Sequence, residues 1–540
     1  MSLETQTSGA LSEPSTGIPL PLDQERRVVE FLRRRTSYAD IPRTVQLIET
    51  HISQVFVTDR FVYKLKKPVR FDFLDFSTVE QRRQACEDEV RLNRRQARDV
   101  YLGVHPIWTD ARGQLHLDGL EARGPVVDYV VQMRRLPTER TLDVLIQRHL
   151  LTDAEITQLA ATLTEFYLKA PSLRVRPEEY RRTIERHVRA NRAALHEACP
   201  PDSASLIQRV HTAQLRALLT QPEMFDQRVQ QGHIIEGHGD LRPEHICLVS
   251  PPVIFDCVEF NAEFRQLDVA DELSFLAMEC DLLGAPAVGK SVIECYQESS
   301  GDRPTPELWA FYKSYRACVR AKVAALRGKQ VVGSQHDVAE HLALDYLHLA
   351  DEYLRPFVRP LLMIVGGMMG SGKSTLARAM SESLGATWLR SDVIRQTLFP
   401  GDRLSAEYNA ARYRPESRTA VYDALLQQAG EQLRQGASVV LDATFGQMSQ
   451  REAALALAQQ HAADCVWIEC RCPREVAMQR ITQRLTAAEP DASEARPELY
   501  DRQAADWQSG DLPATSVTIN TTQPLDAQLT HVYEALGELA

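Results

Sequence analysis

The sequence has few of the features that mark secreted or membrane proteins. Its 540 residues include only ten cysteines, and none of them forms a C-x-x-C pair. Such sparse cysteines predict free thiols in a reducing compartment rather than a disulfide framework or a zinc site. No apolar run is long enough to cross a bilayer, and the first 23 residues lack the basic start and apolar middle of a secretion signal. We therefore expect a cytoplasmic protein with no membrane partner.

The chain also lacks an excess of positive charge. Lys and Arg number 62 against 73 Asp and Glu, which gives a net charge of −11. This balance disfavours broad, non-specific binding to nucleic acid, although it does not exclude a local basic groove. With 44% hydrophobic and 25% charged residues, the composition is that of an ordinary globular protein. The chain is too long for one hydrophobic core, so about two to four domains are expected.

One stretch carries a phosphate-binding pattern. The apolar run Leu361–Val365 predicts a buried strand, and a helix pattern follows the glycines after it. Between them, the spacing G-x-x-x-x-G-K-[ST] supplies a tight loop whose N–H groups turn toward phosphate, a lysine for the β/γ-phosphates and a hydroxyl for Mg²⁺. A Gly/Ser-rich turn without a ligand is the alternative, but the flanking strand and helix favour a bound nucleoside triphosphate. The candidate residues are Gly367, Gly370, Ser371, Gly372, Lys373, Ser374 and Thr375.

The rest of the C-terminal part alternates helices with short apolar strands. The expected strands are 388–390, 438–441, 465–468 and 517–519. This alternation predicts an α/β fold with a parallel sheet covered on both faces, and ligands bind such sheets beyond the carboxyl ends of the strands. Asp392 follows the second strand and Asp442 follows the third. Both carboxylates are therefore expected near the phosphate loop.

These motifs resemble those of the P-loop kinases of small metabolites and of polynucleotide 5′-ends. The resemblance implies that Asp392 faces the acceptor hydroxyl as the base, that Arg395 anchors the acceptor, and that Asp442 holds Mg²⁺. Arg480 and Arg484 lie four apart on one predicted helix and resemble lid arginines that close over the phosphates. A solvated charged face is the alternative for this pair.

A second group of motifs lies in the N-terminal half. The run from His238 to His245 reads H-G-D-L-R-P-E-H, and a buried-strand pattern that ends at Asp256 follows it. The run resembles the catalytic loop of protein-kinase-like folds, in the H-G-D form of aminoglycoside and choline phosphotransferases. The resemblance implies an α+β domain in which Asp240 accepts or orients the acceptor proton and Asp256 binds Mg²⁺. His245 stands where that family has a metal-binding Asn, and it is the candidate second ligand.

The same family pairs a strand lysine with a helix glutamate. The segment Phe61–Lys67 alternates with a period of two, which places Lys64 and Lys66 on one face. A solvated strand edge is the alternative for these lysines. Lys64 is the first candidate for the α/β-phosphates, with Lys66 left open, and Glu89 is preferred to Glu87 as the partner. No glycine-rich loop precedes the lysines.

The two resemblances divide the chain into a disordered tail (1–25), a kinase-like domain (26–354) and a P-loop kinase domain (355–540). This pairing resembles bacterial bifunctional proteins that join an aminoglycoside-phosphotransferase-like domain to an ATP-binding domain. The leading hypothesis is an ATP- and Mg²⁺-dependent phosphotransferase that acts on a hydroxyl of a small molecule. Two alternatives stay open: a polynucleotide 5′-hydroxyl kinase, and a nucleotide-sensing regulatory protein with a degenerate kinase-like domain. The sequence does not identify the acceptor.

Overall fold

The structure, a computed structural model, describes residues 22–71, 74–117, 123–400, 414–486, 495–508 and 515–539. The chain divides into two compact units. Unit 1 contains the chain up to Leu173 together with Ile234–Arg303, and unit 2 contains Arg174–His233 together with the chain from Pro304 onward. Among the helices described, none combines the length and the hydropathy that crossing a bilayer would need.

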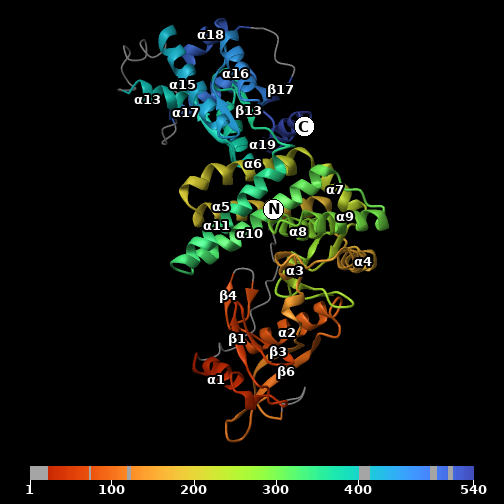
Figure 1. The fold of residues 1–540 in the computed structure, drawn as a ribbon. Helices are drawn as coiled ribbons and strands as arrows, with labels where there is room; N and C mark the ends of the chain where they lie inside the picture. Colours follow the sequence, from red (N-terminus) through yellow and green to blue (C-terminus); the bar gives the residue numbers. More distant parts are fainter. Residues whose placement is uncertain are drawn as a thin grey trace, which may run out of the picture. The chain divides into compact units, whose positions relative to one another are not determined.

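Unit 1 is built on a six-stranded antiparallel sheet with the order β1-β2-β3-β8-β6-β7 (Figure 1). Helix α2 (Val79–Asn93) packs against β6 and β8. Helix α1 (Leu22–Leu32) begins inside the segment predicted to be a tail, whose earlier residues lie outside the described part of the chain. The strands are β1 (Gln46–Glu49), β2 (Ser53–Val57), β3 (Phe61–Lys66), β6 (Tyr101–Thr109), β7 (Leu115–His116) and β8 (Val126–Arg134).

Strand β3 shows the predicted alternation. Tyr63 and Leu65 are buried in one hydrophobic cluster with residues of the neighbouring strands and α1. Lys64 and Lys66 point to the other face, where both reach Glu89 of α2. Because successive side chains of a strand point to opposite faces, a single strand serves the hydrophobic core and a charged site at once.

The H-G-D-L-R-P segment of unit 1 lies between two short antiparallel pairs. Strand β9 precedes the segment and pairs with the later strand β12, and β10 follows the segment and pairs with β11. Helix α8 follows β12, and its N-terminus is capped by the side chain of Asp268. The elements are β9 (Ile234–Glu236), β10 (Ile246–Cys247), β11 (Val253–Ile254), β12 (Gln266–Asp268), α3 (Leu142–Gln147), α4 (Asp153–Lys169), α8 (Val269–Leu282), α9 (Pro286–Ser300) and the small pair β4 (Arg70–Phe71) and β5 (Leu74–Asp75).

Unit 2 contains the predicted parallel sheet. Its order is β14-β15-β13-β16-β17, and all neighbouring strands are parallel, so the strand before the phosphate loop is central. One face packs against α12 and α19, and the other packs against α13, α15 and α16. The strands are β13 (Leu361–Gly367), β14 (Thr387–Arg390), β15 (Val439–Asp442), β16 (Asp464–Arg471) and β17 (Ser516–Asn520). The helices are α12 (Lys373–Leu384), α13 (Ser391–Leu398), α15 (Pro415–Arg434), α16 (Met448–Gln460), α17 (Arg474–Thr486), α18 (Pro497–Ala505) and α19 (Leu525–Gly537).

Further helices complete unit 2, and α5, α6, α10 and α11 lie side by side (Figure 1). Arg189 of α5 donates to the carbonyl of Ser383 at 2.7 Å, and Thr212 of α6 donates to that of Gly385 at 3.1 Å. These helices therefore hold the C-terminal end of α12, whose N-terminus forms the phosphate loop. These helices belong to the same compact unit as the parallel sheet. The domain boundary at 354/355 stays a prediction. The helices are α5 (Pro177–Ala198), α6 (Ala204–Thr220), α7 (Pro222–Gln230), α10 (Pro306–Gly328) and α11 (Ser334–Leu354).

Candidate functional site

The phosphate loop joins β13 to α12. Gly367, Gly370 and Gly372 have φ angles of 140°, 74° and 88°, which favour a residue without a Cβ. Gly372 is the N-cap of α12, so the positive end of that helix opens into the loop. Packing excludes a side chain as well: a Cβ on Gly367 would lie 2.4 Å from the carbonyl oxygen of Cys470, and one on Gly370 would lie 2.6 Å from that of Ala477. The local geometry is that of an anion-binding loop.

Lys373 and Ser374 start α12 beside Asp442, the last residue of β15. Burial raises the pKa of Asp442, against the attraction of Lys373 and the influence of the nearby Ser374 hydroxyl. The Oδ2 atom of Asp442 is buried and has no hydrogen-bond partner among the described residues. Lys373 Nζ donates to the carbonyl of Met368 at 2.9 Å.

These residues fit the Mg²⁺ that the sequence predicts. A buried carboxylate oxygen without a hydrogen-bond partner, near a hydroxyl, supplies the oxygen ligands that Mg²⁺ takes. Within the described ranges, no three His, Cys, Asp or Glu side chains converge as a ready metal site. The remaining ligands would be water and phosphate oxygens, which Mg²⁺ commonly keeps.

The end of β14 adds a second set of charges. Asp392 lies in the first turn of α13, and its Oδ1 is 2.6 Å from Nη1 of Arg395. Because β14 and β15 are neighbours in the sheet, Asp392 and Asp442 come to adjacent strand ends. Arg390 lies over the Trp388 ring at 4.8 Å, and its Nε is 3.8 Å from Oδ2 of Asp442. Sequence reasoning did not select Arg390, although an arginine that ends a strand of the parallel sheet was an available signal.

The lid arginines come from α17. Arg480 donates to Thr521 through both terminal nitrogens, at 3.0 Å to Oγ1 and 2.7 Å to the carbonyl oxygen. The Thr521 hydroxyl in turn donates to the carbonyl of Ser371 in the phosphate loop at 2.6 Å. Arg484 lies one turn further along and is half-buried. The structure thus places Arg480 beside the loop, and it adds Thr521, a residue that no sequence motif marked.

A second unmarked residue also holds the loop. Gln503 of α18 accepts a hydrogen bond from the backbone N–H of Met369 at 2.8 Å. Its amide nitrogen lies 3.3 Å from the hydroxyl of Thr444, two residues past β15. One N–H of the phosphate loop is therefore paired with a side chain in this structure.

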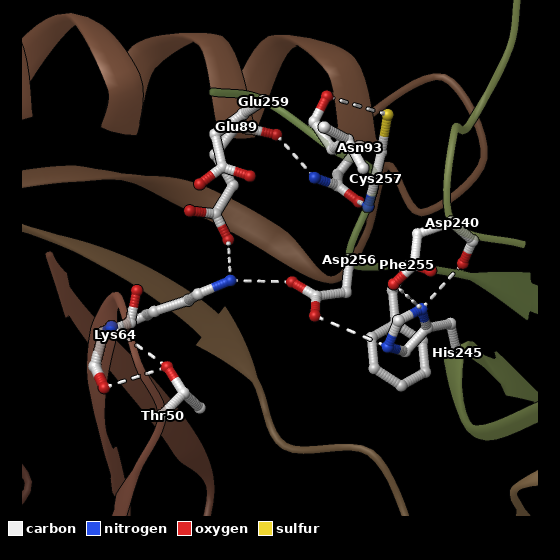
Figure 2. Close-up of polar contacts among 12 residues, drawn as sticks. Thr50, Lys64, Glu89, Asn93, Asp240, His245, Phe255, Asp256, Cys257 and Glu259 are labelled. Atoms are coloured by element: carbon white, nitrogen blue, oxygen red, sulfur yellow. Dashed lines mark hydrogen bonds and ion pairs between the residues drawn. The ribbon is translucent and has the colours of Figure 1, made fainter. Parts of the chain in front are cut away.

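Unit 1 holds a separate charged cluster (Figure 2). Lys64 Nζ lies 2.9 Å from Oε1 of Glu89 and 2.7 Å from Oδ1 of Asp256. Lys66 Nζ lies 2.5 Å from Oε2 of Glu89 and also pairs with Glu259. Burial opposes charge here, but attraction from Asp256 and Glu89 outweighs it and raises the pKa of Lys64. For Asp256 burial is likewise outweighed, chiefly by Lys64, and the pKa of the carboxyl is lowered.

The cluster separates the residues that the sequence left open. The Glu89 side chain is fully buried between the two lysines, whereas Glu87 pairs with Arg83 on the outer face of α2. Both lysines are at most 12% exposed, so neither forms a solvated strand edge. The structure therefore places Glu89 in the cluster and brings Lys66 in together with Lys64.

The H-G-D-L-R-P segment meets this cluster at Asp256. Nε2 of His245 lies 3.6 Å from Oδ2 of Asp256, and its Nδ1 lies 2.9 Å from the backbone carbonyl of Asp240. Arg242 Nε lies 2.9 Å from Oδ1 of Asp240. Asp256 itself has φ of 63°, a left-handed conformation that costs a non-glycine residue energy and is frequent at functional sites. The segment thus gathers Asp240, His245 and Asp256, with Arg242 on the carboxylate predicted to be the base.

Glu272 of α8 binds the backbone of the H-G-D-L-R-P segment. Its Oε1 accepts hydrogen bonds from the backbone N–H groups of His238 at 2.7 Å and Gly239 at 2.6 Å. The hydroxyl of Tyr167 donates to its other oxygen at 3.0 Å. No sequence motif marked Glu272. Its role is to fix the backbone that carries Asp240.

Comparison with known families agrees with the geometry of unit 2. Residues 362–508 match the model of a family described as an AAA domain. This match begins in β13 and contains the phosphate loop, Asp392 and Asp442. Together with the loop geometry, it supports a nucleotide-binding P-loop domain in the C-terminal part.

Solved structures with similarity include several kinases. A gluconokinase from Sinorhizobium meliloti is 19% identical, with a TM-score of 0.26, and the match covers 34% of this chain and 94% of that one. A choline kinase from Cryptosporidium parvum is 10% identical, with a TM-score of 0.39, and the match covers 62% of this chain and 97% of that one.

Relatives of nearly the same extent occur in mycobacteria. They are the "uncharacterized protein Rv2004c" of Mycobacterium tuberculosis and the "uncharacterized protein Mb2027c" of Mycobacterium bovis. Each is 32% identical over 475 residues, a match that covers 86% of this chain and 91% of the mycobacterial protein. With both units inside this alignment for most of their length, the chain belongs to the same family as these two mycobacterial proteins.

Proposed function

We propose that the chain is an ATP- and Mg²⁺-dependent phosphotransferase that acts on a hydroxyl group, with its principal active site in unit 2. The observation that carries the proposal is the gathering of two carboxylates at adjacent strand ends beside a phosphate loop. Oδ2 of Asp442 is buried near Ser374 without a hydrogen-bond partner, and Nε of Arg390 lies 3.8 Å from it. Asp392 lies at the neighbouring strand end in a salt bridge with Arg395. A nucleotide-binding protein with no transfer chemistry would not need the second carboxylate.

The residues of this site have separate tasks in the proposed reaction. The N–H groups of the loop and Lys373 stabilise charge on the β- and γ-phosphates. Asp392 accepts the proton of the acceptor hydroxyl. The hydroxyl oxygen then bonds to the γ-phosphorus while the bond between that phosphorus and the β,γ-bridging oxygen breaks, which releases ADP. Arg395 holds Asp392 in place and supplies a cation to the acceptor. Mg²⁺, held by Ser374 and Asp442, would neutralise phosphate charge.

For unit 1 we propose a second nucleotide site with a kinase-like arrangement. Lys64 and Glu89 would orient the phosphates, and Asp256 with His245 would hold a divalent cation. His245, at the position where the resembling family has a metal-binding Asn, and the lack of a glycine-rich loop before Lys64 favour a sensing role for this unit over a second transfer activity.

The test is a transfer assay with γ-labelled ATP, Mg²⁺ and fractionated cell extract, in which labelled products are identified by mass spectrometry. A short oligonucleotide with a 5′-hydroxyl is included, so that labelling of its end would identify a polynucleotide kinase instead. Asp392→Asn should lower product formation by about a hundredfold or more while ATP binding persists. The exposed carboxylate of Asp423 on α15 gives the matched control, Asp423→Asn, which should retain activity. Unchanged transfer by Asp392→Asn would remove Asp392 from the mechanism.

A further inference from the structure

The charged cluster of unit 1 contains one lysine more than a phosphate site needs. Lys66 is fully buried, with a side-chain exposure of 0%, so no nucleotide can reach its ammonium group. Its contacts are Oε2 of Glu89, Glu259, and the ring of Phe76 at 5.5 Å. A lysine placed in the interior loses its hydration, which is costly unless its partners are well arranged. Lys66 must therefore act through the residues that it touches.

The five charges form an alternating chain. It runs from Asp256 through Lys64, Glu89 and Lys66 to Glu259, and each neighbouring pair is in contact. The two oxygens of Glu89 are divided, one for each lysine. The ends differ in access: the side chain of Asp256 is 40% exposed, whereas that of Glu259 is 4% exposed. One end can exchange partners with a ligand, and the other end is fixed.

The backbone on both sides of this chain is tied together. Lys64 and Lys66 are two apart on β3 and share a face, and they hold two carboxylates that are three apart after β11. Asn93 of α2 accepts a hydrogen bond from the N–H of Cys257, between those carboxylates, at 2.9 Å. Strand β3, helix α2 and the segment after β11 are therefore fixed at the same point.

We propose that Lys66 and Glu259 are positioning residues of the nucleotide site in unit 1, an inference that rests on the function proposed for that unit. Lys66 neutralises one oxygen of Glu89 and fixes the direction of the other. Glu89 then orients the ammonium of Lys64 without quenching its charge, and Lys64 can exchange Asp256 for a phosphate oxygen. Glu259 balances Lys66, so the buried end of the chain is neutral. Without this pair, both oxygens of Glu89 could turn to Lys64, so its ammonium would lose its fixed direction and hold an anion less well.

The test is a double-mutant cycle in the full chain, with Lys373→Met added to silence the phosphate loop of unit 2. The probe is Mg²⁺ with the non-hydrolysable ATP analogue AMP-PNP, and binding is measured by calorimetry. Lys66→Met with Glu259→Met removes the pair together and leaves no buried unpaired charge, a replacement that buried ion pairs often tolerate. Thermal unfolding reports whether the variant folds. If it does not, Lys66→Gln with Glu259→Gln, which also removes both charges and keeps polar side chains, takes its place in the same cycle.

Loss of the pair should weaken AMP-PNP binding about tenfold, the effect of one charge-assisted hydrogen bond. In a Lys64→Met background the same change should have no further effect, because its target is absent. The matched control is Lys67→Met, the next lysine along, which pairs loosely with Glu49 at 3.8 Å and should bind as the parent does. Equal losses with and without Lys64, or no loss at all, would overturn the positioning role. If the Lys373→Met parent binds no AMP-PNP, the nucleotide function of unit 1 fails, and this inference fails with it.

Discussion

The phosphate loop leaves no room for a side chain at Gly370. Its φ of +74° is left-handed, which costs an L-residue roughly 1–2 kcal/mol. A Cβ there would lie 2.6 Å from the backbone carbonyl oxygen of Ala477 and 3.0 Å from Cγ1 of Ile481. Helix backbone cannot rotate away as a flexible side chain does, so overpacking adds about 1–3 kcal/mol. We therefore expect Gly370→Ala to lower the free energy of unfolding of unit 2 by about 2–5 kcal/mol.

The same substitution should affect the ligand. If the loop yields rather than α17, its N–H groups no longer converge on one anion, and the affinity for Mg²⁺-AMP-PNP at unit 2 should fall by about tenfold or more. Denaturant unfolding followed by circular dichroism measures the first effect, and calorimetry measures the second. Both effects have one cause, the contact between the loop and α17.

Gly301, which lies in unit 1, provides the reference for the backbone cost, measured on the unfolding of that unit. Its φ is +75°, and a Cβ there would meet no atom within 4 Å. Gly301→Ala should therefore show the backbone cost alone, about 1–2 kcal/mol, and leave nucleotide binding unchanged. The reasoning is refuted if Gly370→Ala loses no more stability than Gly301→Ala and binds AMP-PNP with the parent affinity.

Three further substitutions test separate contacts. Burial lowers the pKa of His211 from 6.5 to about 4, so the unfolded chain binds this proton near pH 6.5 and the folded chain does not. The stabilisation is present above pH 6.5 and is lost as the pH falls toward 4. Unfolding experiments across this range should show that His211→Leu reduces the slope of the free energy of unfolding against pH, by an amount that corresponds to at most about one proton taken up on unfolding. Arg216→Met breaks the 2.8 Å ion pair between Arg216 and Asp464, whose side chains are 6% and 19% exposed. It should lower the free energy of unfolding by about 2 kcal/mol, measured by denaturant unfolding. Arg378→Met, at an exposed helical pair, should cost less than about 0.5 kcal/mol and serves as its control. Thr521→Val removes the hydroxyl that joins the phosphate loop to the lid, and should weaken AMP-PNP binding about threefold to tenfold by calorimetry; parent affinity would show that this bridge is not needed.

The local motifs were readable because their causes are local. Gly367, Gly370 and Gly372 stand where the loop's own backbone has positive φ angles, and glycine adopts those angles at no steric cost. The alternation along β3 follows from the pleat of a strand, so the shared face of Lys64 and Lys66 needed no knowledge of the fold. The strands of the parallel sheet were likewise found from their apolar runs and from the helices between them.

The choice between neighbouring candidates needed the tertiary structure. Glu87 and Glu89 are two apart on α2 and point to nearly opposite sides, and only the packing of α2 on the sheet decides which one is buried. From the sequence, Lys64 and Lys66 were alternative candidates for one phosphate-binding role. The structure includes both, because Glu89 offers one oxygen to each.

Residues that support a site from a distance had no signature at all. Thr521 and Gln503 reach the phosphate loop from more than a hundred positions away, through the order of the strands and the packing of α17 and α18. The sequence by itself determined where a phosphate can be held, since that depends on backbone angles and adjacent side chains. Only the tertiary structure decided which side chains fix the phosphate loop in place, because those contacts depend on which distant segments the buried sheet brings together.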